Sequence, residues 1–437
     1  MTNVDLVEWQ TLEPEASSLK GIVPIFDRIA ERTVVELQST GKLEILQLRT
    51  GIKIRASSWV GRVTLGNLTI TVRPKIEGAP LLNLLRYSYS LRDLETFSQT
   101  KYDIAHGSFQ DLIVVRLADE IDELLSRGLH RHYMRFDHEL ARPSGRINFV
   151  ELARNIASAK SPLYCTYFNR SDRVLLNCVL LAGLRLAARV TVDKQLTVRV
   201  LRLTQVLAES VPVIQLTSRE LGKARKAIDR RTTAYRSALV LINILLEGMG
   251  TSIGESSEMV PLGGFLFDMN RFFQALISRF LHDELADFSI QDEHTLKGIF
   301  EYDKANNPRR HRAIVPRPDF AVLSHGKVIE FLDTKYIDLW ETPPPANILY
   351  QLVIYAMSKS TSKPRSTILF PTLAAEAVEQ VILLKDPKEG SRRAEVVLRP
   401  VNLFELEKLT RPRMGTIVAQ QRRKFAHALA FGAAAHL

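Results

Sequence analysis

The chain has 437 residues, of which 46% are hydrophobic, so it has material for more than one globular core and does not belong to the disordered class. Lys and Arg outnumber Asp and Glu by 59 to 48, and the net charge of +11 favours approach to polyanions such as nucleic acid. The two cysteines, Cys165 and Cys178, are too few for a disulfide framework or a structural zinc site.

No secretory signal or membrane span is expected. The first residues lack the basic and apolar regions of a signal peptide. The most apolar long run, residues 174–190, is interrupted by Arg185 and Arg189 and is too short to cross a membrane. We therefore expect a soluble, cytoplasmic protein with no membrane partner.

Residues 1–105 are predicted to form an N-terminal β-rich module. Helical spacing covers residues 22–40 and 81–89, and four β-like runs lie between them, at residues 43–47, 52–56, 62–65 and 68–72. Gly66-Asn67 between two of these runs indicates a hairpin. Arg73-Pro74-Lys75 suits an edge strand protected by proline and charge.

Residues 106–255 are predicted to form a helical middle domain. Apolar residues recur at helical spacing in residues 112–125, 173–188 and 234–246. One basic cluster either grips phosphate or is a solvated helix end: Arg127, His130, Arg131, His132 and Arg135. The glycines at 248, 250 and 254 follow a helix rather than a strand, which indicates a linker and not a dinucleotide site.

Residues 256–437 are predicted to form a mixed α/β domain. The expected order is a helix at 265–285, strands at 297–301, 320–323 and 328–333, a helix at 346–359, a strand at 367–370, and a later helix with the basic run 422–424. The strands at 320–323 and 328–333 are separated by a Gly-containing turn and read as a hairpin.

Three residues of this hairpin suit metal-dependent phosphodiester cleavage. Asp319 opens its first strand and Asp333 closes the second. Because side chains alternate along a strand, we expect Asp333 and Lys335 on one side and Thr334 pointing away, with its carbonyl available. Two carboxylates and a carbonyl can hold Mg²⁺, with Mn²⁺ as a substitute, and the lysine can orient water or neutralise charge on phosphate.

Other interpretations of these residues remain open. Asp319 can be a strand-entry residue, and Asp333 with Lys335 a solvated pair at a sheet edge. Gln351 and Tyr355, four apart on one helix face, can be ordinary surface residues. The loop at 306–312 is either a mobile surface loop or a DNA contact next to the acids, and in the second case its candidate residues are Arg309, Arg310, Arg312 and the nearby Arg317.

Ordered motifs along almost the whole chain resemble one family. They are Ser58-Trp59-Val60-Gly61, residues 70–76, Arg127-Gly128-Leu129, Gly145-Arg146-Ile147, residues 265–270, Arg317-Pro318-Asp319, Asp333-Thr334-Lys335-Tyr336 and Tyr350-Gln351. The acids and lysine resemble the PD-(D/E)xK nuclease superfamily, whose core is a mixed sheet flanked by helices. The chain as a whole resembles McrC, the nuclease subunit of McrBC-type modification-dependent restriction systems.

The resemblance implies a role for each matched residue. Asp319 and Asp333 would be metal ligands, Lys335 the catalytic lysine, and Gln351 with Tyr355 a supporting helix motif. The region of residues 73–75 would engage a motor subunit. The family often presents a glutamate in the helix after residue 270, where this chain has Gln274, which can join the metal only as a neutral ligand.

The sequence contains no Gly-x-x-x-x-Gly-Lys-Ser/Thr motif, so a nucleotide-driven motor would be a separate polypeptide. The resemblance implies a GTP-hydrolysing AAA+ partner of the McrB type, DNA as substrate, and a higher-order hetero-oligomer. The predicted function is that of a Mg²⁺-dependent endodeoxyribonuclease subunit that works with its motor. The alternatives are a regulatory adapter that stimulates the partner's NTP hydrolysis and cuts poorly, and a stand-alone structure-specific repair nuclease.

Overall fold

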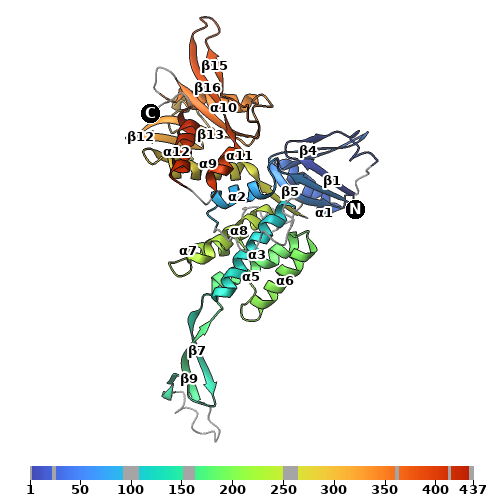
Figure 1. Ribbon diagram of the computed structural model, residues 1–437, viewed down its shortest axis with the longest axis vertical. Coiled ribbons are helices and arrows are strands. Elements are labelled where there is room, and N and C mark those ends of the chain that lie inside the picture. The colour runs from blue at the N-terminus through green and yellow to red at the C-terminus, as the bar shows by residue number, and fades with distance from the viewer. Residues whose placement is uncertain are drawn as a thin grey trace. The chain divides into compact units, whose positions relative to one another are not determined.

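The computed structural model describes residues 2–21, 26–91, 108–150, 163–249, 264–359, 364–411 and 415–432 (Figure 1). The chain divides into two compact units. One combines the N-terminal residues with Leu266–Leu437, and the other contains Gln110–Phe265. The predicted domain boundaries at residues 105 and 255 lie outside the described residues and stay predictions.

Two small sheets form the N-terminal part of the first unit. The four predicted β-runs are confirmed as β3 (Leu43–Leu48), β4 (Gly51–Ala56), β5 (Trp59–Leu65) and β6 (Leu68–Arg73). The predicted helices are α1 (Arg28–Ser39) and α2 (Gly78–Ser88). Two further strands, β1 (Thr2–Val7) and β2 (Thr11–Leu12), complete sheets of order β1-β6-β5-β10 and β2-β4-β3, with β1 parallel to β6.

The fourth strand of the first sheet comes from far along the chain. Residues 264–268 form β10 (Gly264–Asp268), and α9 (Met269–Glu284) follows at once, so the prediction of one helix over 265–285 is wrong at its start. Phe265, Leu266 and Phe267 are all buried, and such a short apolar run does not by itself distinguish strand from helix. Asp268 ends the strand and caps the helix, because its carboxylate accepts the Asn270 N–H at 2.9 Å.

The C-terminal part of this unit contains a six-stranded mixed sheet. Its order is β11-β12-β13-β14-β16-β15, and β13, β14 and β16 run parallel. The strands are β11 (Ser289–Asp292), β12 (Phe320–Ser324), β13 (Lys327–Thr334), β14 (Arg365–Thr372), β15 (Gln380–Lys385) and β16 (Arg392–Asn402). The predicted strand at 297–301 is wrong, because Gly298 adopts a positive φ of 81° within a turn, and β11 is the strand that precedes the hairpin.

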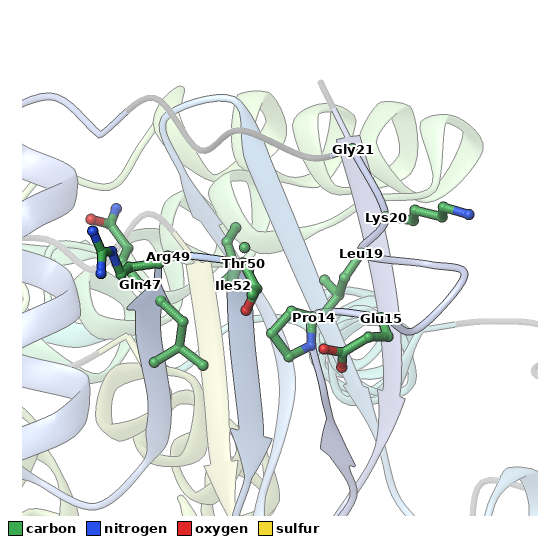
Figure 2. A pocket seen from close by; sticks show the side chains of 11 residues that line it. Pro14, Glu15, Leu19, Lys20, Gly21, Gln47, Arg49, Thr50 and Ile52 are labelled. Carbon is green, nitrogen blue, oxygen red and sulfur yellow. The ribbon is translucent and has the colours of Figure 1, made fainter.

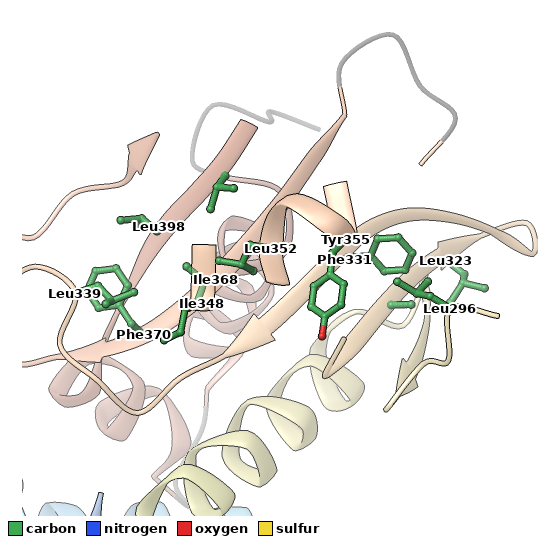
Figure 3. Packing of buried hydrophobic residues seen from close by; sticks show 12 residues of the cluster. Leu296, Leu323, Phe331, Leu339, Ile348, Leu352, Tyr355, Ile368, Phe370 and Leu398 are labelled. Carbon is green, nitrogen blue, oxygen red and sulfur yellow. The ribbon is translucent and has the colours of Figure 1, made fainter. Parts of the chain in front are cut away.

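Helices cover this sheet and bury both of its faces. They are α10 (Ala346–Met357), α11 (Leu403–Thr410), α12 (Thr416–Phe431) and α9. Helix α10 contacts β13, β14 and β16, whereas α9 and α12 contact β13. Figure 3 shows Leu352 and Tyr355 of α10 in one apolar cluster with Phe331, Ile368 and Phe370 of the strands. The alternate residue Leu332 is also buried, as expected for a strand covered on both sides.

The hairpin that carries the two acids is closed by a tight turn. His325 and Gly326 both have positive φ, 49° and 77°, as the two central residues of a type I′ turn require. Strands β12 and β13 pair antiparallel, with Phe320 opposite Leu332. The register shifts by one residue between Val322 and Leu323, and beyond this shift the ends of the two strands meet.

The second unit is mainly helical, as predicted, but it also contains a sheet. Its helices include α3 (Phe109–Arg127), α5 (Leu175–Val190), α6 (Lys194–Ala208), α7 (Ser218–Lys226) and α8 (Arg236–Gly248). The sheet, of order β7-β9-β8, was not predicted; its strands are β7 (His132–Leu140), β8 (Arg146–Ile147) and β9 (Leu163–Ser171). Most of β7 is exposed, so it lacks the apolar alternation that announces a strand.

Among the described residues, no helix is long and apolar enough to cross a membrane.

Candidate active site

The hairpin brings the two predicted acids together at the end of the mixed sheet. Asp319 immediately precedes β12, and Asp333 is the penultimate residue of β13. Because Phe320 pairs with Leu332, Asp319 stands beside Asp333 on the neighbouring strand. Lys335 follows β13 and donates its backbone N–H to the Leu369 carbonyl of β14 at 3.1 Å, which holds the lysine at the same strand end.

The Asp319 carboxylate binds two neighbours. Its Oδ2 accepts the backbone N–H of Thr334 at 2.7 Å and also the Thr334 hydroxyl, while its Oδ1 accepts Nε2 of Gln274 at 3.1 Å. The Thr334 side chain thus contacts Asp319 and does not point away from the acids, contrary to expectation. The reason is that Asp319 lies just outside its strand, where its carboxylate reaches across the end of β13.

Asp333 is the more buried of the two acids, with 1% of its surface exposed. Its Oδ2 accepts Nζ of Lys335 at 2.6 Å, and its Oδ1 is buried without a hydrogen-bond partner among the described residues. Burial first, and then the charge of Asp319, raise the pKa of Asp333 to about 6, against the opposing effect of Lys335. The site therefore disfavours negative charge on Asp333 unless a cation compensates it.

The oxygen atoms at this strand end fit a hard divalent cation. The unpartnered Oδ1 of Asp333, the Asp319 carboxylate and the Thr334 carbonyl are ligand types that Mg²⁺ prefers. The Thr334 carbonyl also accepts Lys335 Nζ at 3.3 Å. Within the described ranges no group of three His, Cys, Asp or Glu side chains could hold a metal, which agrees with a neutral glutamine at position 274.

Helix α10 reaches the site through Tyr355. The Tyr355 hydroxyl donates to the Arg317 carbonyl at 2.9 Å and accepts Gln351 Nε2 at 2.6 Å. The ring itself is 1% exposed and packs in the cluster under the sheet (Figure 3). Burial, followed by the charge of Asp333, raises the pKa of Tyr355 to about 12, so the hydroxyl stays protonated as a donor. Tyr355 thus fastens the chain two residues before Asp319, and Gln351 supports Tyr355.

The predicted basic loop precedes Asp319 as an exposed turn. Asn307 closes it by accepting the His311 N–H and donating to the His311 carbonyl, both at 2.9 Å. Arg309, Arg310 and Arg312 are exposed, and in the part of the chain that the structure describes no carboxylate forms an ion pair with them. Arg317 differs, because its Nη1 contacts Oε2 of Glu293 at 3.1 Å.

The basic cluster of the second unit is paired with acids. Arg127 contacts Glu123, Arg131 contacts Asp172 at 2.7 Å, and Arg135 contacts Asp137 at 3.0 Å. These pairs are largely exposed and add little to stability. They also neutralise part of the charge that the sequence suggested for phosphate binding.

Three residues next to the site had no role assigned from the sequence. Tyr336 follows Lys335, is 3% exposed, and donates its hydroxyl to Oε1 of Glu8 at 3.0 Å. Its backbone N–H donates to Oδ1 of Asn270 at 3.0 Å. Burial raises the pKa of Glu8 to about 7, although hydrogen bonds from Lys75 and Tyr336 oppose the rise. Tyr336 and Asn270 belong to motifs noted in the sequence, whereas Glu8 carries no local signal of burial.

A cavity of about 800 Å³ lies elsewhere, in the N-terminal module. Figure 2 shows it between the chain around Pro14 and Leu19 and the β3–β4 turn at Thr50. Its charged lining residues are Glu15, Lys20 and Arg49. This set lacks the paired acids of the strand-end site, so the cavity is not the candidate active site.

The fold and the strand-end residues define a multidomain α/β protein in which two carboxylates and a lysine meet at the ends of inner strands of a mixed sheet. The family model of the McrBC 5-methylcytosine restriction system component matches residues 54–371. The chain belongs to this family, and the predicted resemblance to McrC is confirmed.

One solved structure supports the same fold. A structure described as the refined half-complex from the tetradecameric assembly of Thermococcus gammatolerans McrB AAA+ hexamers with bound McrC matches with a TM-score of 0.65 and 16% identity, covering 97% of this chain and 99% of that chain. A cryo-EM structure of the Thermococcus gammatolerans McrBC complex matches with a TM-score of 0.47 and 18% identity, over 65% and 88% of the two chains. No curated protein sequence matches this chain.

Proposed function

We propose that this chain is the Mg²⁺-dependent endodeoxyribonuclease subunit of an McrBC-like restriction system and that its C-terminal sheet is a PD-(D/E)xK core. The observation that carries the proposal is the Asp333 carboxyl group: it is 1% exposed, has an unpartnered Oδ1, stands beside Asp319, and contacts Lys335 Nζ at 2.6 Å. Because buried polar atoms are usually satisfied, an unpartnered carboxylate oxygen beside a second acid and a lysine suits a bound cation.

The residues divide the chemistry of phosphodiester hydrolysis among them. Asp319, Asp333 and the Thr334 carbonyl would hold Mg²⁺, or Mn²⁺ as a substitute, and Gln274 could add a neutral oxygen after rotation of its amide. The bound ion would supply Lewis-acid stabilisation of charge on the phosphate. Lys335, held beside Asp333, would orient the attacking water and offset developing negative charge. Tyr355 and Gln351 would keep the backbone before Asp319 in place.

DNA and a motor subunit are the proposed partners. Arg309, Arg310 and Arg312 are exposed cations on the segment that leads into Asp319, where they can meet the DNA backbone, and Arg317 would join them. The similar solved structure contains McrB AAA+ hexamers with McrC bound. For this chain we propose a GTP-hydrolysing AAA+ partner of that type within a higher-order hetero-oligomer in the cytoplasm.

The test is DNA cleavage by the assembled complex. The full chain, combined with an AAA+ GTPase partner of the McrB type, Mg²⁺ and GTP, is expected to cut modified DNA. Asp333→Ala should abolish cutting while stimulation of the NTPase stays intact, and Asp287→Ala, which removes an exposed aspartate, should cut as the wild type does. Cutting by Asp333→Ala at the wild-type rate would show that the site has been assigned to the wrong residues.

Gln274 favours one alternative, a regulatory adapter. Its amide occupies Oδ1 of Asp319 at 3.1 Å, where a carboxylate would add attraction for a metal ion. An adapter would stimulate the partner's NTP hydrolysis and leave DNA intact with Mg²⁺ or Mn²⁺. Robust cutting without partner or nucleotide would instead indicate a stand-alone nuclease.

A further inference from the structure

The residue after the proposed catalytic lysine is tied to the N-terminal sheet. Tyr336 donates its hydroxyl to Oε1 of Glu8 at 3.0 Å, and the same oxygen accepts the backbone N–H of Lys75 at 2.9 Å. Glu8 lies just after β1, is 2% exposed, and donates its own backbone N–H to the Arg73 carbonyl at 2.9 Å. The side chain of Tyr336 therefore ends on the junction of β1 and β6.

A second connection runs through the first turn of α9. Asn270 Oδ1 accepts the backbone N–H of Tyr336 at 3.0 Å, and Asn270 Nδ2 donates to the Ser58 hydroxyl at 2.6 Å. The N–H of Met269 donates to the Ser58 carbonyl at 3.0 Å. Ser58 lies just before β5, so this connection ends on the same four-stranded sheet.

The two connections converge on the strand-end site from both sides. Helix α9 also carries Gln274, one turn after Asn270. Gln274 contacts Asp319. On the other side Lys335 stands between Thr334, bound by Asp319, and Tyr336, bound by Glu8 and Asn270. Bonds to buried polar groups such as Glu8 and Ser58 are costly to break, because they leave an unpaired donor or acceptor in the interior.

Resting on the proposed function, we infer that Glu8, Ser58, Asn270 and Tyr336 are positioning residues, through which the N-terminal sheet fixes Lys335 and the α9 side of the metal site for cleavage. Among the described residues, none of the four forms a hydrogen bond with the carboxylates of Asp319 and Asp333 or with Lys335 Nζ. They act through the backbone on either side of Lys335 and through the start of α9. Displacement of a catalytic group by about 1 Å can reduce a rate by up to roughly 100-fold. We therefore expect the loss of these bonds to slow the chemical step.

The experiment compares variants of the full chain in the partner-dependent cleavage assay. Tyr336→Phe removes one hydroxyl, and Glu8→Leu removes its acceptor; each should lower kcat by about tenfold and leave the KM for DNA unchanged. Glu8→Gln keeps an acceptor oxygen and should cut nearly as the wild type does. The matched control is Tyr350→Phe, at a tyrosine that is 70% exposed. Tyr336→Phe combined with Glu8→Leu should be no slower than either single variant.

A second measurement tests how firmly the backbone around Lys335 is held, without relying on DNA cleavage. Hydrogen exchange of residues 333–337, followed by mass spectrometry below the lowest Tm of the set, should accelerate in Tyr336→Phe and Glu8→Leu and stay unchanged in Glu8→Gln and Tyr350→Phe. Wild-type kcat and wild-type exchange in the first two variants would overturn the inference. The proposed function is judged separately by Asp333→Ala: if the wild type itself does not cut, the nuclease assignment fails and the exchange data alone decide the positioning role.

Discussion

At the scale of single residues, Asp333 combines two properties that rarely persist without a ligand. It is buried beside a second carboxylate, and one of its oxygens lacks a partner among the described residues. Burial and the Asp319 charge raise its pKa to about 6, so a proton and a metal ion compete for the same group. Only the deprotonated carboxylate can bind the metal.

This competition predicts the pH dependence of cleavage. At limiting Mg²⁺, activity should fall as pH drops through about 6, because Asp333 takes up a proton. Saturating Mg²⁺ should move the midpoint to lower pH, since the ion displaces the proton. The measurement is a pair of pH–rate profiles at low and high Mg²⁺. Identical midpoints in the two profiles would mean that Asp333 does not bind the metal.

Gln274 gives a gain-of-function test of the same site. Gln274→Glu places a carboxylate next to Asp319, so the Mg²⁺ concentration for half-maximal cutting should fall by about tenfold, because ligand charge dominates affinity for hard cations. Without metal the added like charge should destabilise the fold. Gln420→Glu, on the exposed side of α12, changes the net charge equally and serves as the control. An unchanged Mg²⁺ requirement in Gln274→Glu would exclude position 274 from the metal site.

At the scale of elements, the N-terminal sheet contains a buried acid whose ionisation opposes folding. Burial raises the pKa of Glu8 in the folded state to about 7 from its ordinary value of 4.5, so the folded state holds the proton more tightly. The corresponding stability is fully present below pH 4.5 and is lost as pH rises through about 7. The difference is about 3 kcal/mol, from roughly 1.4 kcal/mol for each pKa unit.

Glu8→Gln should therefore flatten the pH dependence of stability. Glutamine keeps an oxygen for Tyr336 and Lys75 but carries no charge, so the variant should gain Tm relative to the wild type at pH 8 and show little gain at pH 4. Thermal unfolding at the two pH values checks this, with Glu44→Gln on the exposed side of β3 as the control. A gain of equal size at both pH values would indicate that charge on Glu8 is not the cause.

The elements that were predicted correctly are those with local causes. The hairpin of β12 and β13 has its turn, its apolar runs and both acids within one continuous segment, residues 319–333, so Asp319, Asp333 and Lys335 could be assigned to it from the sequence. Strand β10 pairs with β5, some 200 residues earlier in the chain, and no local pattern indicates that partner. The bond between Tyr336 and Glu8 spans 328 residues and likewise depends on the tertiary fold.

At the scale of the whole molecule, the cations behind the net charge of +11 are not equally available to a polyanion. Several arginines are committed to internal pairs: Arg422 is buried against Glu284, and Arg399 against Glu379 at 2.7 Å. The basic run 422–424 is therefore only partly available to a polyanion. The exposed arginines of the loop before Asp319 are better placed, because they lie next to the acids in the chain and carry no ion pair among the described residues.

Removing these loop charges should weaken DNA binding in a salt-dependent way. In an Asp333→Ala background, which prevents cutting, Arg309, Arg310 and Arg312 are replaced by alanine, and DNA affinity is measured from roughly 50 to 200 mM salt. Each phosphate contact contributes about −0.9 to the slope of log K against log salt, so the slope should become shallower by about 1 to 3. The control is a second triple variant in which Arg225, Lys226 and Arg230, exposed on and after α7, are replaced by alanine, which removes the same charge. Equal losses in both triple variants would assign DNA binding to overall charge and not to the loop beside the acids.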